Sequence, residues 1–171
     1  VVPLKTANGV ALSTVSQPTM IALMLEQLQV TPRARTLEIG SGSGYNAALL
    51  AELTGPEGSV VTVEIDPDIA AIAASNLARA GYGGVRTVCN DGRAGEPHYA
   101  PYDRIIVTAC APSLSSALCD QLRPGGRIVA PIGNPERQRS AVFENTPSGL
   151  RETGAIACKF VPLRKSSESS S

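Results

Sequence analysis

The stretch LEIGSGSG, residues 37–44, decides the fold, because an apolar, β-prone run passes directly into closely spaced glycines. Glycine lets the backbone turn sharply and approach a ligand with no Cβ in the way. The helix expected to follow, over 45–53, would present its unpaired N–H groups to the same ligand. The stretch therefore predicts a strand, a glycine loop and a helix that together bind a nucleotide-like group.

Short β-rich runs alternate with helical patterns along the rest of the chain. We expect strands over 35–39, 59–64, 85–89, 103–108 and 127–131, and helices over 18–28, 45–53, 67–80 and 113–122. This alternation predicts parallel strands joined by right-handed crossovers. Two later runs, 140–144 and 155–161, are joined through a turn at 146–149 and predict antiparallel strands. The expected fold class is α/β: a Rossmann-like, doubly wound, mostly parallel sheet with an antiparallel edge and helices on both faces.

The spacing of the glycines distinguishes two classes of nucleotide ligand. A dinucleotide fingerprint needs the pattern G-x-G-x-x-G, but Tyr45 occupies the position of its third glycine. Gly40, Gly42 and Gly44 instead form the pattern G-x-G-x-G. This pattern favours S-adenosylmethionine over NAD as the cofactor.

Acidic residues follow the next two strands. Glu64 ends the strand over 59–64, where a carboxylate can accept hydrogen bonds from both ribose hydroxyls. Asp91 and Gly92 follow the strand over 85–89, where a carboxylate and a main-chain N–H suit an adenine ring. Glycine turns and acidic strand ends are individually common in purely structural roles. Their order after three successive strands, however, places them at the carboxyl edge of the sheet, where open α/β sheets bind ligands.

Composition and charge argue against several classes of protein. The 171 residues fit one domain, which we expect over 1–165, followed by a disordered polar tail over 166–171. The apolar residues are interleaved with turn signals and form no run of ~18 that would span a membrane. Lys plus Arg equals Asp plus Glu at 15 each, with no basic block, so nucleic acid is not an expected partner. The cysteines lack paired spacing and no leader precedes the first strand, which predicts a cytoplasmic protein. The sequence does not indicate an oligomeric state.

These motifs together resemble the protein-L-isoaspartate O-methyltransferases. The resemblance runs from about Ser13 to Leu163 and rests on residues 13–18 (STVSQP), 37–44, 91–93 (DGR), 100–103 (APYD), 109–112 (ACAP), 121–126 (QLRPGG) and 160–163 (FVPL). It implies an enzyme that transfers a methyl group from S-adenosylmethionine to the α-carboxylate of L-isoaspartyl residues in a peptide or protein. These residues arise through a succinimide, and the ester favours re-closure of that ring, which allows repair. The product of the cofactor would be S-adenosylhomocysteine.

The resemblance also implies roles for individual residues. Ser16 matches the family's active-site serine. The segment of Ser13, Thr14, Val15 and Ser16 is expected to close over the cofactor. The expected cofactor contacts are Glu38, Gly40, Ser41, Gly42, Gly44, Glu64, Ile65, Asp91 and Gly92. The peptide groove is expected to be lined by Ala109, Cys110, Ala111 and Pro112.

The chain departs from the family's pattern at several positions, which keeps other functions open. Only fifteen residues precede Ser16, where family members carry several tens, and Asn90, Cys110 and Arg164 replace residues that are usual there. One alternative is O-methylation of an aspartate side chain in a ribosomally made, biosynthetic peptide. A second is small-molecule methylation. The third belongs to another class, a catalytically inactive module that binds S-adenosylmethionine, and the short N-terminal segment favours it.

The chemistry expected of the enzyme needs neither a base nor a metal. A carboxylate acceptor with a pKa near ~4 is already ionised at neutral pH, so alignment and removal of water dominate catalysis. The hydroxyl of Ser16 is suited to orient a carboxylate oxygen, and the alternative is that Ser16 caps the helix beginning at Pro18. His98 is the chain's one histidine and no cysteine repeats near it, so no metal site is expected.

Overall fold

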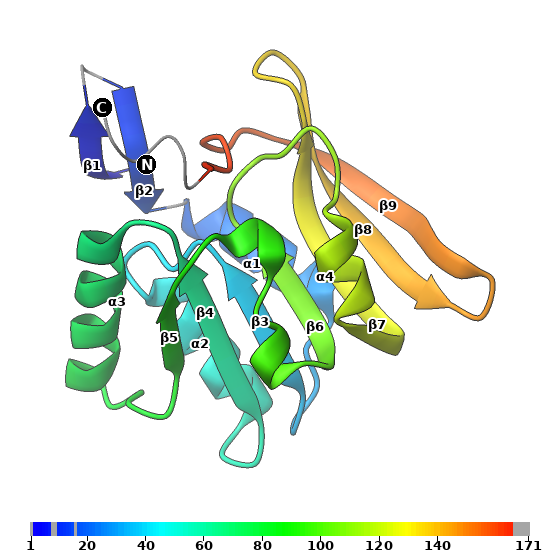
Figure 1. Ribbon diagram of the computed structural model, residues 1–171, viewed down its shortest axis with the longest axis horizontal. Helices are drawn as coiled ribbons and strands as arrows, with labels where there is room; N and C mark the ends of the chain where they lie inside the picture. The colour runs from blue at the N-terminus through cyan, green and yellow to red at the C-terminus, as the bar shows by residue number, and fades with distance from the viewer. Residues whose placement is uncertain (1, 8–9, 16, 166–171) are drawn as a thin grey trace.

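The computed structural model describes residues 2–7, 10–15 and 17–165. Its largest element is a seven-stranded sheet in the order β5-β4-β3-β6-β7-β8-β9 (Figure 1). The strands are β3 (Arg35–Ile39), β4 (Ser59–Glu64), β5 (Arg86–Cys89), β6 (Tyr102–Val107), β7 (Leu122–Gly133), β8 (Gln138–Thr146) and β9 (Gly149–Cys158). The strands from β5 to β7 pair in parallel, whereas β8 pairs antiparallel with both β7 and β9. The predicted mostly parallel sheet with an antiparallel edge is confirmed.

The strand order reverses at β3, the first strand of this sheet in the chain. β4 and β5 follow on one side of β3, and β6 and β7 lie on the other. The loops that leave β3 and β6 therefore diverge at the carboxyl edge, which opens a crevice there. In open α/β sheets such a switch point is the place where ligands bind.

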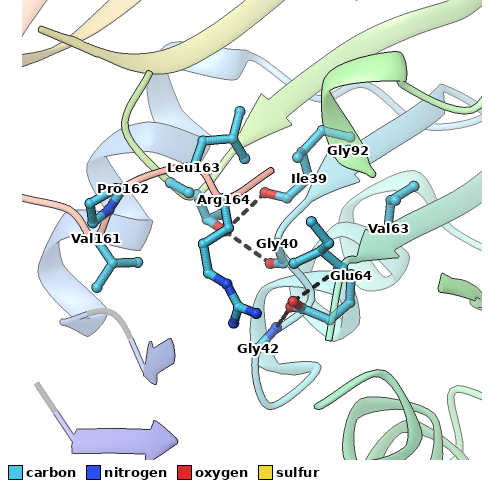
Figure 2. A pocket seen from close by; sticks show the side chains of 13 residues that line it. Ile39, Gly40, Gly42, Val63, Glu64, Gly92, Val161, Pro162, Leu163 and Arg164 are labelled. Carbon is cyan, nitrogen blue, oxygen red and sulfur yellow. Dashed lines mark hydrogen bonds between the residues drawn. The ribbon is translucent and has the colours of Figure 1, made fainter. Parts of the chain in front are cut away.

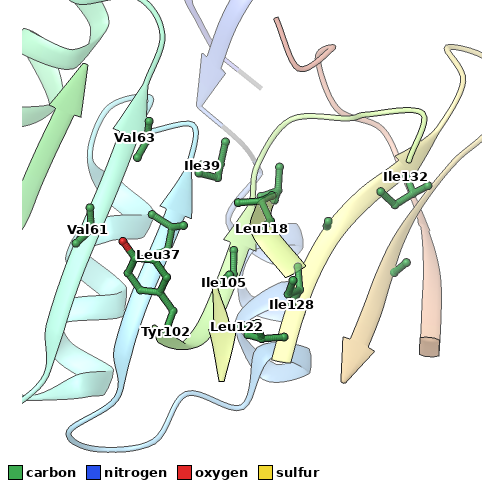
Figure 3. Packing of buried hydrophobic residues seen from close by; sticks show 13 residues of the cluster. Leu37, Ile39, Val61, Val63, Tyr102, Ile105, Leu118, Leu122, Ile128 and Ile132 are labelled. Atoms are coloured by element: carbon green, nitrogen blue, oxygen red, sulfur yellow. The ribbon is translucent and has the colours of Figure 1, made fainter. Parts of the chain in front are cut away.

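Helices cover both faces of the sheet, as predicted (Figure 1). The helices α1 (Pro18–Leu28), α2 (Tyr45–Thr54) and α3 (Pro67–Arg79) share one apolar cluster with β4, β6 and β7. On the other face, α4 (Ser116–Asp120) contributes Leu118 to a second cluster (Figure 3). This face also carries two single-turn 3-10 helices, η1 (Gly92–Ala94) and η2 (Pro97–Tyr99), in the connection between β5 and β6. Alternate side chains of each strand enter opposite clusters, because successive residues of a strand point to opposite faces.

The second cluster packs against the middle of the sheet, beneath the carboxyl edge. Figure 3 shows Leu37, Val61, Ile105 and Ile128 from four neighbouring strands packed on this face. Tyr102 is also buried there, and its hydroxyl donates a hydrogen bond of 2.6 Å to the carbonyl of Glu96. The sheet therefore offers a fixed platform for the loops that leave β3, β4 and β6.

Most predicted boundaries agree with the structure, but α4, β7 and β9 differ, and the strand expected over 155–161 is β9 over Gly149–Cys158. The helix expected over 113–122 is reduced to Ser116–Asp120, and the strand expected to begin at residue 127 begins at Leu122. The reason is that Leu122 already pairs with Tyr102 of β6, and a register shift before the next pair accommodates the intervening turn residues. α3 begins as predicted, with the Asp66 side chain accepting from the backbone N–H groups of Asp68 and Ile69.

An N-terminal hairpin was not predicted. Strands β1 (Val2–Ala7) and β2 (Val10–Val15) pair antiparallel and form a separate two-stranded sheet (Figure 1). The signal in the sequence is the dipeptide of Asn8 and Gly9 between two β-prone runs, which is a strong predictor of a hairpin. Ser16 and the predicted polar tail over 166–171 lie outside the described residues. Within the described ranges, the structure contains no helix long and apolar enough to cross a membrane.

Candidate functional site

A pocket opens at the carboxyl ends of β3, β4 and β6 (Figure 2). It holds about 560 Å³ of empty space, a figure that includes space open to solvent. Its lining residues are Ile39, Gly40, Gly42, Val63, Glu64, Ile65, Gly92, Thr108, Ala109, Val161, Pro162, Leu163 and Arg164. Six of these residues were predicted from the sequence to bind cofactor or substrate: Gly40, Gly42, Glu64, Ile65, Gly92 and Ala109.

Gly40 is required by both its conformation and its surroundings. Its φ of +97° is one that side-chain-bearing residues rarely adopt, and a Cβ there would lie 2.4 Å from Thr108 Oγ1. The Thr108 hydroxyl lies within hydrogen-bond distance of the carbonyls of Ile39, at 3.0 Å, and Gly40, at 2.9 Å. Because the end of β6 contacts the turn this closely, only glycine fits at the start of the loop.

Glu64 is oriented by backbone N–H groups. Its Oε1 accepts from the N–H groups of Ile65 at 3.0 Å and Asp66 at 3.2 Å, and its Oε2 accepts from the N–H of Gly42 at 3.3 Å. The residue is only 8% exposed, yet it lines the pocket. A carboxylate held this way keeps acceptor capacity on the pocket side, since its two oxygens together offer about four lone-pair sites.

Gly44 and Ser41 support the loop without lining this pocket. Gly44 caps α2 with a φ of +86°, and a Cβ there would lie 3.0 Å from Leu77 and 3.1 Å from the carbonyl of Ala73. Gly44 therefore allows α2 and α3 to approach closely. Ser41 is 3% exposed, and its hydroxyl lies 2.7 Å from that of Thr62.

Glu38 lies behind the glycine loop, on the face of the sheet that carries α2. The strand alternation places Ile39 in the pocket and turns the Glu38 side chain the other way. The carboxyl accepts from Asn46 Nδ2 at 2.7 Å and from the Thr62 hydroxyl at 2.6 Å. Glu38 is fully buried and does not line the pocket, so its predicted direct contact with the cofactor has no support from its position.

Burial raises the pKa of the Glu38 carboxyl from its ordinary 4.5 to about 7. The hydrogen bonds from Thr62 and Asn46 oppose this rise, and the nearby negative charge of Glu64 adds to it. A buried carboxylate is costly because the medium around it solvates the charge poorly. Glu38 is therefore an acid that titrates near neutral pH in the folded protein.

Asp91 and Gly92 differ in how they meet the pocket. Gly92 lines it, and a Cβ there would lie 2.3 Å from Ile39 Cγ2. The Asp91 carboxylate accepts from the backbone N–H of Arg93 at 3.0 Å and pairs with the guanidinium of Arg93 at 2.6 Å. Asp91 is thus held beside the pocket in a fixed orientation, and its predicted contact with adenine stays a prediction.

The C-terminal segment 161–164 closes the pocket from a distant part of the sequence. The N–H of Cys110 donates to the carbonyl of Val161 at 2.8 Å, and the N–H of Leu163 donates to the carbonyl of Cys110 at 2.7 Å. Arg164 extends across the pocket toward Glu64 (Figure 2), and its guanidinium lies 3.5 Å from the Asp66 carboxylate. Thr108 and these four residues were not among the predicted site residues, although the FVPL motif at 160–163 pointed to the segment.

The predicted substrate loop separates this pocket from a second one. Ala109 lines the first pocket, whereas Ala111 and Pro112 line the second. Leu163 contributes to both. The second pocket is lined by Arg93, Val107, Ala111, Pro112, Ser113, Leu114, Ser115, Leu118, Ala130, Pro131, Ile132, Leu163 and Lys165. Two adjoining pockets with a shared wall suit a reaction between two bound molecules.

Other candidate residues lie apart from these pockets. Ser13, Thr14 and Val15 belong to β2, and their side chains, like all of Ser16, lie outside what the structure describes. His98 is exposed in η2 with its ring against Tyr99, and it lines neither pocket. No group of three or more His, Cys, Asp or Glu side chains gathers as a metal site among the described residues.

Replacing Gly40 tests the loop conformation. We expect Gly40→Ala to lower the free energy of unfolding by at least about 2 kcal/mol, because the positive φ and the contact with Thr108 both oppose a side chain. Gly83→Ala is the matched control, since Gly83 has open space around its Cβ position and no positive φ, and it should change stability by less than about 0.5 kcal/mol. Urea denaturation of both variants measures the difference. Equal stabilities would contradict the assigned strain.

The raised pKa of Glu38 predicts how stability depends on pH. A carboxyl titrating at 4.5 when unfolded and about 7 when folded stabilises the fold fully below pH 4.5, and this contribution is lost as pH rises to about 7. Glu38→Gln has no such loss. The stability of Glu38→Gln minus that of wild type should therefore grow between about pH 5 and about pH 8, by up to about 3 kcal/mol. Denaturant titrations across this range check it, and a difference independent of pH would refute the raised pKa.

Comparison with known proteins assigns the chain to a family. Residues 3–168 match the family model described as Protein-L-isoaspartate(D-aspartate) O-methyltransferase. A curated protein-L-isoaspartate O-methyltransferase from Methanoculleus marisnigri is 52% identical over 161 residues, which cover 94% of this chain and 70% of that protein. A solved structure with the same description is 34% identical, with a TM-score of 0.88, and the match covers 96% of this chain and 52% of that one.

A second solved structure, from Plasmodium falciparum, was determined in complex with S-adenosyl-L-homocysteine. It is 24% identical with a TM-score of 0.80, and the match covers 95% of this chain and 79% of that one. This similarity supports the Rossmann-like fold. The present chain spans about half the length of the first solved structure. The chain belongs to the protein-L-isoaspartate O-methyltransferases, a family of S-adenosylmethionine-dependent enzymes.

Proposed function

We propose that this chain transfers the methyl group of S-adenosylmethionine to the α-carboxylate of L-isoaspartyl residues in peptides or proteins, as a step in their repair. The observation that carries the proposal is the pocket at the carboxyl edge, where Glu64 faces the glycine loop beside Gly92. Gly40 and Gly92 occupy positions where a Cβ would collide with Thr108 and Ile39. A backbone without Cβ atoms at these two positions suits a ligand that lies directly against it.

The methyl donor fits the first pocket through groups of this chain. The Glu64 carboxylate, fixed by three backbone N–H groups, is suited to accept hydrogen bonds from the two ribose hydroxyls. Gly92 lines the pocket with its backbone, and Asp91, held by Arg93, is proposed to add a carboxylate for the adenine amino group. Ile65 contributes an apolar wall. We assign the remaining loop residues Ser41 and Gly44 a supporting role in the same site.

The second pocket is suited to receive the peptide. Ala111 and Pro112 line it together with the apolar Leu114 and Leu118, and it adjoins the first pocket at the shared Leu163. Ala109 lies on the side of the first pocket, while the backbone of Cys110 holds the C-terminal segment. The loop 109–112 would therefore set the acceptor carboxylate beside the methyl donor.

The chemistry proposed here depends on positioning. The donor supplies a methyl carbon bonded to a positively charged sulfur, and the acceptor carboxylate is already ionised at neutral pH. No general base is then required, which agrees with the position of exposed His98 outside both pockets. Alignment of the two reacting groups and exclusion of water would supply the rate.

Ser16 is proposed to orient the acceptor carboxylate, and Ser13, Thr14 and Val15 to cover the donor. The competing interpretation, in which Ser16 caps α1, is weakened by the structure. The N-cap residue of α1 is Gln17, and Pro18 occupies the first helical position. A capping role for the preceding serine would not be the usual one, since the side chain that caps belongs to the N-cap residue itself.

The setting of the protein is also proposed. We expect one domain over 1–165, a cytoplasmic location and no nucleic acid partner. The four cysteines are free thiols, which suits a reducing compartment. Equal numbers of basic and acidic residues give no general attraction to phosphates.

Matched peptides test the proposed substrate. We expect methyl transfer from S-adenosylmethionine to a peptide with one L-isoaspartyl residue, which forms a base-labile methyl ester. The same peptide with L-aspartate should show no transfer above background. Glu64→Gln should weaken donor binding by roughly tenfold or more, because it removes a charge-assisted acceptor. Glu57→Gln is the control, since Glu57 is an exposed residue paired with Arg33 outside the pocket.

Each unfavourable result of this assay identifies a different alternative. Methylation of the aspartyl peptide would favour modification of an aspartate side chain, as in a biosynthetic peptide. Binding of the donor without transfer to any peptide would favour an inactive binding module. Unchanged donor affinity in Glu64→Gln would remove Glu64 from the site.

A further inference from the structure

A network of four polar side chains lies directly behind the glycine loop, outside the pocket itself. It joins Glu38 of β3, Ser41 of the loop, Thr62 of β4 and Asn46 in the first turn of α2. All four residues are buried, with exposures of 0%, 3%, 0% and 6% in that order. Buried polar groups carry a large cost unless they are mutually satisfied, so a network here is expected to restrict the loop to one arrangement.

The network is connected to both halves of the proposed donor site. Ser41 stands between Gly40 and Gly42, which line the pocket. Thr62 precedes Glu64 by two residues on the same strand and face, so a shift of Thr62 displaces the carboxylate proposed to hold the ribose. Asn46 ties the start of α2 to the same carboxyl group. Glu38 is the member on which these connections converge.

The hydrogen bonds depend on the charge of Glu38. The amide of Asn46 and the hydroxyl of Thr62 both donate to its two oxygens, an arrangement that suits a carboxylate. Asn46 Oδ1 is buried and accepts no hydrogen bond from any described residue. The network therefore contains a buried acceptor without a hydrogen bond from the described part of the chain, Asn46 Oδ1, whose burial is unfavourable. It also contains the Glu38 carboxyl, which accepts its hydrogen bonds most strongly when it is ionised.

Among the described residues, the charged group that raises the pKa of Glu38 is Glu64. From β4 the neighbours are Thr62 and, at the edge of the pocket, Glu64. From α2 the neighbour is the uncharged Asn46, and on β6 the register partner is the apolar Ile106. Burial and the field of Glu64 keep the pKa of Glu38 at about 7. A new positive charge in the adjoining pocket acts in the opposite direction and favours ionisation.

We propose that Glu38 is a positioning residue that holds the glycine loop through Thr62 and Asn46, and that it gives up its proton when the cationic methyl donor binds. The proton leaves Glu38 for water and buffer, and the carboxylate that remains strengthens the two hydrogen bonds it accepts. The demethylated product lacks the sulfonium charge, so it favours ionisation less. Glu38 thereby raises the affinity of the site for the donor above its affinity for the product. This preference grows as the pH rises.

The inference rests on the proposed function, because it needs the donor to bind beside Glu64. The test is calorimetric titration near pH 7 in two buffers that differ in ionisation enthalpy, which gives the number of protons released on binding. Wild type should release more protons with S-adenosylmethionine than with S-adenosylhomocysteine. Glu38→Gln should abolish this difference and lower the preference for the donor by about threefold or more. His98→Ala is the control, since His98 is exposed and lines neither pocket, and it should leave the difference intact.

A second pair of variants tests the connection to the loop without altering the acid. Thr62→Val removes the hydroxyl between Glu38 and Ser41 and should weaken donor affinity by about threefold to tenfold. Thr87→Val is its matched control on the neighbouring strand. Thr87 is the register partner of Thr62, and its hydroxyl is buried but bonds to no described residue, so its loss should change affinity by less than about twofold.

The outcomes separate this inference from the function on which it rests. If wild type binds neither ligand, the proposed function and the inference both fail. If wild type binds the donor but proton release is the same for both ligands, or survives in Glu38→Gln, the inference alone is overturned. Equal affinities of Thr62→Val and Thr87→Val would likewise show that the network does not position the loop.

Discussion

The site depends on the parallel pairing of β3 with β4, whose hydrogen bonds continue past the end of β3 into the glycine loop. Ile39 pairs with Val63, and the next residue, Gly40, donates its N–H to the carbonyl of Val63 at 2.8 Å. Gly42 then donates to the Glu64 carboxylate at 3.3 Å. The glycine loop is thus a continuation of the sheet, and the position of Glu64 relative to the loop follows from strand register.

The main elements could be predicted because their local signals agree with the fold. Pro67 after a capping Asp66 begins α3, and the glycines after β3 begin a loop and a helix. The antiparallel edge followed from two β-prone runs separated by a turn containing Gly149, which adopts a φ of +101°. Glu64 and Gly92 could be predicted to lie together because the carboxyl ends of parallel strands lie on one edge of the sheet, and both line the pocket. These inferences need only local pattern and the handedness of crossovers.

The remaining features depend on contacts between distant residues. Leu163 and Arg164 join the pocket because the backbone of Cys110 binds their segment, which no periodicity reveals. Leu122 pairs with Tyr102, so β7 begins earlier than its own sequence indicates. The contact of Glu38 with the cofactor stays a prediction, and strand alternation turns its side chain to the face opposite the pocket. The alternation was visible in the sequence, but the buried partners Asn46 and Thr62 were not.

A crystal structure of this chain with S-adenosylhomocysteine would test the central claim most directly. The account predicts that the ribose hydroxyls lie about 2.5–3.0 Å from the Glu64 carboxylate, with the adenine ring beside Gly92. It also predicts that Glu64 keeps its hydrogen bonds from Gly42, Ile65 and Asp66. A ligand bound at another edge of the sheet, or a Glu64 side chain turned away from the ribose, would contradict the account.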